Sequence, residues 1–143
     1  MKIREQLSKL ACEITEIRRD LHMHPEIGFE EERTSQIVAE FLASAGIEVH
    51  RGLGKTGVVG TLKCGDGDKS IALRADMDAL EMQEQNSFSH RSVYDNKMHG
   101  CGHDGHTAML LGAAKHLAES RNFNGTAYFI FQPAEEGLAG ADA

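Results

Sequence analysis

The protein has 143 residues, the size of about one domain, and its 41% hydrophobic and 26% charged residues are typical of a globular chain rather than a disordered one. Its 15 Lys and Arg against 22 Asp and Glu give a net charge of −7, which disfavours binding to nucleic acid or to anionic membranes. The longest apolar stretch, 108–114, is far shorter than the ~20 residues of a membrane span. The N-terminus lacks an apolar signal segment, and the three cysteines cannot all pair, so we expect a reduced, cytoplasmic protein.

The first part of the chain predicts two helices. Apolar residues recur every three or four positions over 3–21, which favours a helix packed on a core over a coiled coil, because the pattern stops at Pro25. A second apolar stripe predicts a helix from about 30 to 45, and Gly46 is a suitable stop.

The middle of the chain predicts strands. Alternating or apolar runs lie at 47–50, 57–63 and 71–73, and we expect the last of these to be a short buried strand. The dipeptide Asp66-Gly67 is a hairpin signal between the second and third runs. Residues 81–99 are polar and irregular, which predicts a long loop of the kind that is usually functional or mobile.

The last part of the chain predicts a helix over 104–119 and a strand over 126–131. The strand is apolar and β-prone, which is typical of a buried central strand, and Pro133 ends it. The order helix, helix, strands, helix, strand favours an α/β layered sheet.

The densest group of potential metal ligands lies between His99 and His106, where three His, Cys101 and Asp104 occur in a glycine-rich segment. Thiolate and imidazole are ligands of zinc and similar divalent metals, so we favour a metal site. The alternative is a helix cap with scattered surface histidines, whereas a zinc finger fits poorly because no second ligand pair exists. Asp104 is expected to cap the following helix, whose dipole would favour a Cys101 thiolate.

Acidic pairs follow two of the predicted strands. Glu135 and Glu136 come just after the strand at 126–131, and Asp76 and Asp78 follow the one at 71–73. Ligands of open α/β sheets bind outside the carboxyl ends of strands, and a carboxylate beside a metal-bound water can act as a general base. A solvated acidic turn is the alternative for Glu135-Glu136. The convergence of three such segments on one sheet edge favours a metal-assisted hydrolase.

Two other motifs carry less weight. Residues 52–57 match G-x-G-x-x-G, but a strand rather than a helix follows, and Val49 occupies the position of the first P-loop glycine. Cys101 could act as a thiol nucleophile, but a histidine two residues away is poorly placed to activate it.

Four motifs occur in an order that resembles a known family: residues 18–26, 73–80, 98–106 and 131–137. The chain resembles the N-terminal part of the amidohydrolase branch of the dinuclear metallo-aminopeptidase-like family, which includes hippurate hydrolase, N-acyl-amino-acid amidohydrolases and auxin-conjugate hydrolases. The resemblance implies an α/β fold, a truncated helix/mixed-sheet/helix catalytic domain. Residues 1–143 would be its N-terminal portion, with the lid or dimerisation domain and the C-terminal remainder outside the chain.

The resemblance also implies a site with two divalent ions (Mn²⁺, Zn²⁺, Co²⁺ or Ni²⁺) and a small N-acyl amino acid as substrate. The implied roles are metal ligands Cys101, His103 and Glu136, general base Glu135, ligand-orienting Asp78, and surrounding residues Asp76, Asp104 and His106. Two further ligand histidines would lie outside the chain, so we expect the chain alone to be inactive. The alternative is a non-catalytic domain that only binds metal or associates with another chain, and apolar surface on the strand at 126–131 would favour self-association.

Overall fold

The computed structural model describes residues 3–137 and 139–143, with the side chains of residues 3–7 and 9 outside the description. The predicted contacts of Ile3 and Leu7 therefore lie outside the described residues. The elements are α1 (Ile3–Met23), α2 (Glu32–Ser44), β1 (Glu48–Leu53), β2 (Gly57–Cys64), β3 (Ser70–Asp76), α3 (His103–Ser120) and β4 (Gly125–Gln132). Every predicted helix and strand is present with shifted ends, and 77–102 contains no helix or strand, which confirms the long loop.

The sheet is mixed, and within the described residues its strand order is β1-β2-β4-β3. β4 pairs antiparallel with β2 and parallel with β3, so the expected central strand is confirmed. The hairpin expected from Asp66-Gly67 is wrong, because β4 lies between the strands that this turn connects. The connection instead crosses the start of β4, where the side-chain oxygen of Asn124 accepts a hydrogen bond of 2.7 Å from the Gly67 N–H. With β4 between β2 and β3, the backbone hydrogen bonds of both edges of this apolar strand are satisfied. A hairpin of β2 and β3 would leave β4 outside the centre of the sheet.

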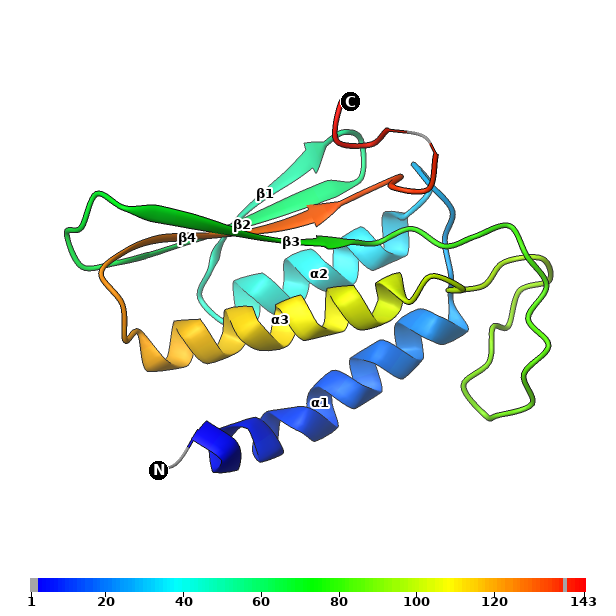
Figure 1. The fold of residues 1–143 in the computed structure, drawn as a ribbon, viewed down its shortest axis with the longest axis horizontal. Coiled ribbons are helices and arrows are strands. Elements are labelled where there is room, and N and C mark those ends of the chain that lie inside the picture. Colours follow the sequence, from blue (N-terminus) through cyan, green and yellow to red (C-terminus); the bar gives the residue numbers. More distant parts are fainter. Residues whose placement is uncertain (1–2, 138) are drawn as a thin grey trace.

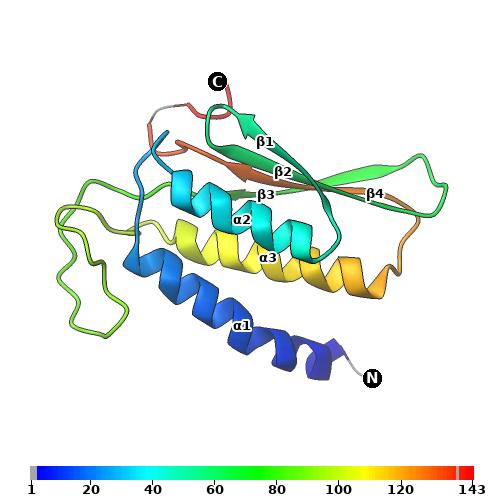
Figure 2. The ribbon, with the colours of Figure 1, turned by 180° about the vertical axis from the view of Figure 1, so that it is seen from behind.

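The helices lie on one face of the sheet (Figure 1). α2 and α3 contact the strands, and α1 packs against α3 on the side away from the sheet, as the opposite view also shows (Figure 2). A Cβ on Gly112 would lie 3.2 Å from the Ile14 side chain, so this glycine lets α1 and α3 approach closely. The packed-helix prediction for α1 is thus confirmed. No helix of the described chain covers the other face of the sheet, so the helix/sheet/helix layering is present on one side only.

The core lies between the sheet and the two helices that contact it. Side chains alternate along β4, and Ala127, Phe129 and Phe131 are buried against α2 and α3. Burial of each of the two Phe side chains contributes about 1.5–3 kcal/mol.

The edge strand β3 corrects two expectations. Ile71, which is 62% accessible, and Ala72 are exposed rather than buried, and Leu73 is half-buried against the core. Full burial is confined to the end of the strand, at Ala75 and Asp76. The expected apolar edge surface on 126–131 is also wrong, because β4 is an internal strand. The edge strands instead expose Ile71 of β3 and Leu53 of β1, while Tyr128 of β4 is exposed on the open face of the sheet.

None of the helices in the described part of the chain has the length and apolar character needed to cross a membrane.

Candidate metal centre

His103 lies at the centre of the site, in the first turn of α3. Gly102 precedes it in the left-handed conformation, with φ 83°, and turns the chain into the helix. The buried His103 ring places Nδ1 2.9 Å from the Asp78 carbonyl oxygen and 3.2 Å from Asp78 Oδ1. Both oxygens can only accept, so Nδ1 donates, and the lone pair of Nε2 points the other way. This is how a metal-binding histidine is usually oriented.

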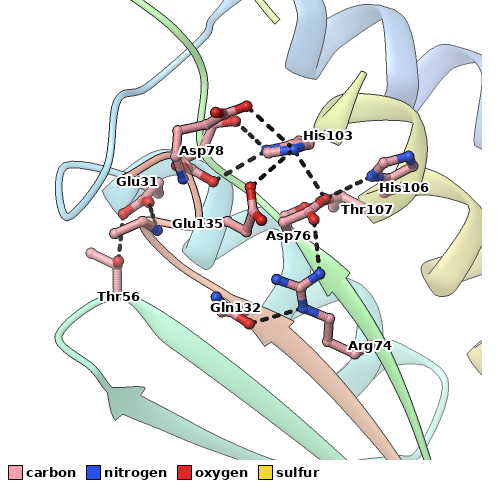
Figure 3. A network of polar contacts seen from close by, with 12 residues as sticks. Glu31, Thr56, Arg74, Asp76, Asp78, His103, His106, Thr107, Gln132 and Glu135 are labelled. Carbon is pink, nitrogen blue, oxygen red and sulfur yellow. Dashed lines mark hydrogen bonds and ion pairs between the residues drawn. The ribbon is translucent and has the colours of Figure 1, made fainter. Parts of the chain in front are cut away.

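Three carboxylates surround Nε2 of His103, and Figure 3 labels two of them, Asp76 and Glu135. Nε2 lies 3.6 Å from Asp76 Oδ1, 3.8 Å from Glu135 Oε2 and 3.7 Å from Glu136 Oε1. Burial alone would lower the pKa of His103, but the hydrogen bond to Asp78 and the charges of Asp76 and Asp78 raise it above its ordinary value. The site therefore carries concentrated negative charge that a cation would neutralise.

The ligand atoms form two overlapping groups among the described residues. Cys101, His103 and Glu136 offer ligand atoms that all lie within 4.8 Å of one another, and so do Asp76, His103 and His106. Two ligand atoms on a tetrahedral zinc ion lie about 3.4 Å apart, given bonds of about 2.1 Å. The 3.7 Å between His103 Nε2 and Glu136 Oε1 is close to that separation. Thiol, imidazole and carboxylate donors in this arrangement fit a zinc-like divalent cation.

Cys101 departs from one expectation. A hydrogen bond with Glu136, together with some desolvation and the negative charges of Glu136, Glu135 and Asp76, raises the pKa of the exposed Cys101 thiol. The expectation of a Cys101 thiolate is therefore wrong in this arrangement, because these carboxylates place negative charge beside the sulfur.

Asp76 at the end of β3 and Asp78 just after it both lie beside His103. Asp76 Oδ1 accepts a hydrogen bond of 2.7 Å from His106 Nδ1, and Asp76 Oδ2 pairs with Arg74 at 3.1 Å. Asp78 is almost fully buried, and its Oδ2 accepts a hydrogen bond of 2.8 Å from the Glu136 N–H. Burial opposes the charge of Asp78, but the hydrogen bonds from His103 and from the backbone of Glu136 and Glu135 lower its pKa.

Comparison with known proteins identifies a family for this chain. Residues 72–143 match the model of peptidase family M20/M25/M40. The chain belongs to this family. It is 52% identical to hippurate hydrolase of Campylobacter jejuni over 143 residues, covering 100% of this chain and 37% of that enzyme. It is 46% identical to the N-acyl-L-amino acid amidohydrolase of Geobacillus stearothermophilus, covering 96% of this chain and 38% of that protein.

Solved structures of M20 proteins have the same fold. The Bacillus subtilis YXEP protein, described as a dinuclear metal-binding peptidase of the M20 family, superposes with a TM-score of 0.89 at 42% identity. The match covers 94% of this chain and 38% of that protein. The chain thus spans less than two-fifths of the length of these M20 relatives.

Asp104 does not cap α3 as expected. It lies in the first turn, and its Oδ2 is 2.7 Å from His22 Nδ1 and 2.8 Å from Arg18 Nε, so it pairs with α1 instead. His22 Nε2 is 3.0 Å from Glu84 Oε1. This buried chain of contacts joins α1, the loop 81–99 and the start of α3. His22 lies within the motif 18–26 that carries the family resemblance, but no sequence signal placed Glu84 beside it.

Two more buried polar groups lie near the centre. The His99 ring is 4% exposed, and neither of its nitrogens has a hydrogen-bond partner among the described residues. Burial lowers the pKa of His99 to about 4, so the ring is neutral at pH 7. Glu31 is fully buried beside the turn that carries Glu135, and nothing in the acidic run 30–32 distinguishes it in the sequence.

Proposed function

We propose that the chain supplies the ligands and the general base of one side of the metal centre of an amidohydrolase that cleaves N-acyl amino acids. The observation that carries this proposal is the grouping of Cys101, His103 and Glu136, with His103 oriented by Asp78. The names of the relatives, hippurate hydrolase and N-acyl-L-amino acid amidohydrolase, support the substrate class.

The ligand roles follow from the donor atoms. Sγ of Cys101, Nε2 of His103 and a carboxylate oxygen of Glu136 would hold a divalent cation, and the complete centre would hold two such ions. Bound divalent metal lowers the pKa of water from 15.7 to about 7 and polarises the substrate carbonyl. Mn²⁺, Zn²⁺, Co²⁺ and Ni²⁺ are all compatible with this donor set. Asp78 keeps the Nδ1 proton on His103, which leaves Nε2 free for the cation.

Glu135 is the group that moves the proton. Its side chain is 39% exposed, and Oε2 lies 3.8 Å from His103 Nε2, so water and substrate can reach it beside the cation. Glu135 takes a proton from the water that attacks the amide carbon, and it delivers that proton to the leaving nitrogen. The C–N bond breaks, and the products are a carboxylic acid and an amino acid. Asp76, His106 and Asp104 shape the surroundings.

A cavity beside Glu136 offers space for the acyl group. It has a volume of about 470 Å³, and its lining includes the apolar side chains of Ile27, Ala79, Leu80 and Met82. Glu81 and Glu136 also line the cavity. An apolar or aromatic acyl group would pack against its apolar side chains.

We also propose that residues 1–143 form the N-terminal portion of the catalytic domain. Coverage of 37–38% of the relatives supports this organisation. The lid or dimerisation domain, the C-terminal remainder and the remaining ligands would come from residues outside the chain.

The test is hydrolysis of N-benzoylglycine and N-acetylated amino acids by a polypeptide of the relatives' length that begins with this chain. Replacing Cys101 with Ser should lower both metal content and turnover, whereas replacing the exposed Cys12 of α1 with Ser, as a matched control, should change neither. Full turnover with Cys101→Ser, or no amide hydrolysis by the metal-loaded parent, would contradict the proposal.

A further inference from the structure

A buried carboxylate outside the metal centre contacts the turn that carries Glu135 and Glu136. Glu31 lies just before α2 and is 0% exposed. Its Oε1 accepts a hydrogen bond of 2.8 Å from the Ala134 N–H, and its Oε2 accepts one of 2.6 Å from the Thr56 hydroxyl (Figure 3). Glu31 therefore joins the start of α2, the β1–β2 turn and the turn after β4.

The turn after β4 needs support of this kind. Ala134 has φ 49°, in the left-handed region that residues with a Cβ rarely adopt without stabilising contacts. On the other side of Glu135, the Glu136 N–H donates to Asp78 Oδ2 at 2.8 Å. Two buried carboxylates, Glu31 and Asp78, thus hold the backbone immediately before and after Glu135.

The glycine-rich stretch 52–57 contributes to the same support. A Cβ on Gly57 would collide with the Leu53 carbonyl oxygen and would lie 3.2 Å from Cδ of Pro133, next to Ala134. A Cβ on Gly54 would lie 3.0 Å from the Gly140 carbonyl oxygen. The glycines of the G-x-G-x-x-G stretch at 52–57 therefore allow the β1–β2 turn to lie directly against the segment that follows β4.

Stability alone does not account for a carboxylate in this position. Desolvation by burial raises the pKa of Glu31, and the hydrogen bonds from Thr56 and Ala134 offset that effect only in part. Apolar residues of similar volume usually stabilise a buried site at least as well as charged ones. A carboxylate is useful here because it can accept from two donors on two different segments at once.

We propose that Glu31 is a positioning residue that acts through Thr56 and the Ala134 amide to fix Glu135 and Glu136 beside His103. The consequence for metal binding rests on the proposed function of Glu136 as a ligand. The consequence for the order of the turn rests on the contacts of Glu31 alone.

The experiment compares the parent chain with Glu31→Ala, Glu31→Gln and, as a control on the same helix start, Glu32→Ala, an exposed neighbour. Amide hydrogen exchange by NMR reports the order of the turn, with the Phe129 amide in β4 as the reference for global stability. Co²⁺ titration, followed by the thiolate-to-cobalt absorption, reports the affinity at Cys101. Each variant is also made in a Glu136→Gln background.

Glu31→Ala should speed exchange at Ala134 by about 10-fold beyond any change at Phe129, because the Ala134 amide loses its hydrogen-bond acceptor. Exchange at Glu136 should also become faster, because the turn that carries it is less ordered. It should weaken Co²⁺ binding by about 10-fold or more, as loss of groups that hold metal ligands does. Glu31→Gln should stay within about threefold of the parent, since the amide can accept from one donor and donate to the Thr56 oxygen. In the Glu136→Gln background, Glu31→Ala should change Co²⁺ affinity by less than about twofold, because its effect passes through Glu136.

Unchanged exchange at Ala134 and Glu136 in Glu31→Ala would overturn the proposal, as would an equal loss of Co²⁺ affinity with and without the Glu136 carboxylate. A parent chain that binds no Co²⁺ would contradict the proposed metal centre, and the exchange rates would then decide the role of Glu31: faster exchange confined to the turn supports it, and uniform change refutes it. If Glu31→Ala fails to fold, Thr56→Val removes one donor and should give the same pattern to a smaller extent.

Discussion

Replacing Glu84 with Gln tests how the loop 81–99 is held beside the metal centre. Burial would raise the pKa of Glu84, but hydrogen bonds from the Ser92 N–H, the Asn86 amide and the His22 ring lower it from 4.5 to about 2. That lowering corresponds to about 3 kcal/mol of stability at pH 7. Because the pKa is lower in the folded state, this stability is present above pH 4.5 and is lost as the pH falls towards 2. At pH 3 about 1.4 kcal/mol should remain.

Urea unfolding of the parent chain and Glu84→Gln at pH 7 and pH 3 measures both values. The variant should be less stable by up to about 3 kcal/mol at pH 7, and the difference should shrink by about 2 kcal/mol at pH 3. Glu81→Gln, which removes an exposed carboxylate of the same loop, should change the free energy of unfolding by less than about 0.5 kcal/mol. An equal Glu84 effect at both pH values would refute the assignment of this stability to the carboxylate charge.

Three further predictions concern the metal centre. In the longer polypeptide, Glu135→Gln should lower turnover by about 100-fold to 10,000-fold with nearly normal metal content, and near-normal turnover would reassign the general base. Asp78→Ala should weaken metal binding by about 10-fold to 100-fold, measured by competition with a chelator, because His103 and the Glu136 backbone lose their partner; unchanged affinity would refute that role. The 143-residue chain alone should bind fewer than two ions, weakly, should leave Cys101 open to alkylation and should not hydrolyse N-acyl amino acids. Two tightly bound ions with turnover would show that its ligand set is complete.

Local patterns predicted most of the elements because each depends on nearby residues. The apolar stripe of α1 and the β-prone run of β4 are properties of a few turns or a single strand. Strand order is different. β4 separates β2 from β3, and the pairing of Val58 with Phe131 depends on contacts between distant segments that a dipeptide such as Asp66-Gly67 does not encode. The exposure of Ile71 follows from the same arrangement, because β3 becomes an edge strand.

The sequence predicted those site residues whose side chains commonly bind metal and which lie next to the end of a strand or helix. Cys101, His103 and Glu136 are unusual donors placed at the ends of elements, and the structure brings them together. Glu31 was not predictable, because a carboxylate in an acidic run is usually solvated, and its burial arises from a turn 103 residues away. The partners of Asp104 were not predictable either. A capping role can be inferred from the sequence of the helix itself, whereas the side chains that Asp104 contacts come from the distant helix α1.

The most direct test of the proposed metal centre is anomalous X-ray diffraction from crystals of the protein grown with zinc. The account predicts an ion bound by Cys101 Sγ at about 2.3 Å and by His103 Nε2 and a Glu136 oxygen at about 2.0–2.2 Å. An ion bound through His103 Nδ1, or one that contacts none of these three side chains, would contradict it.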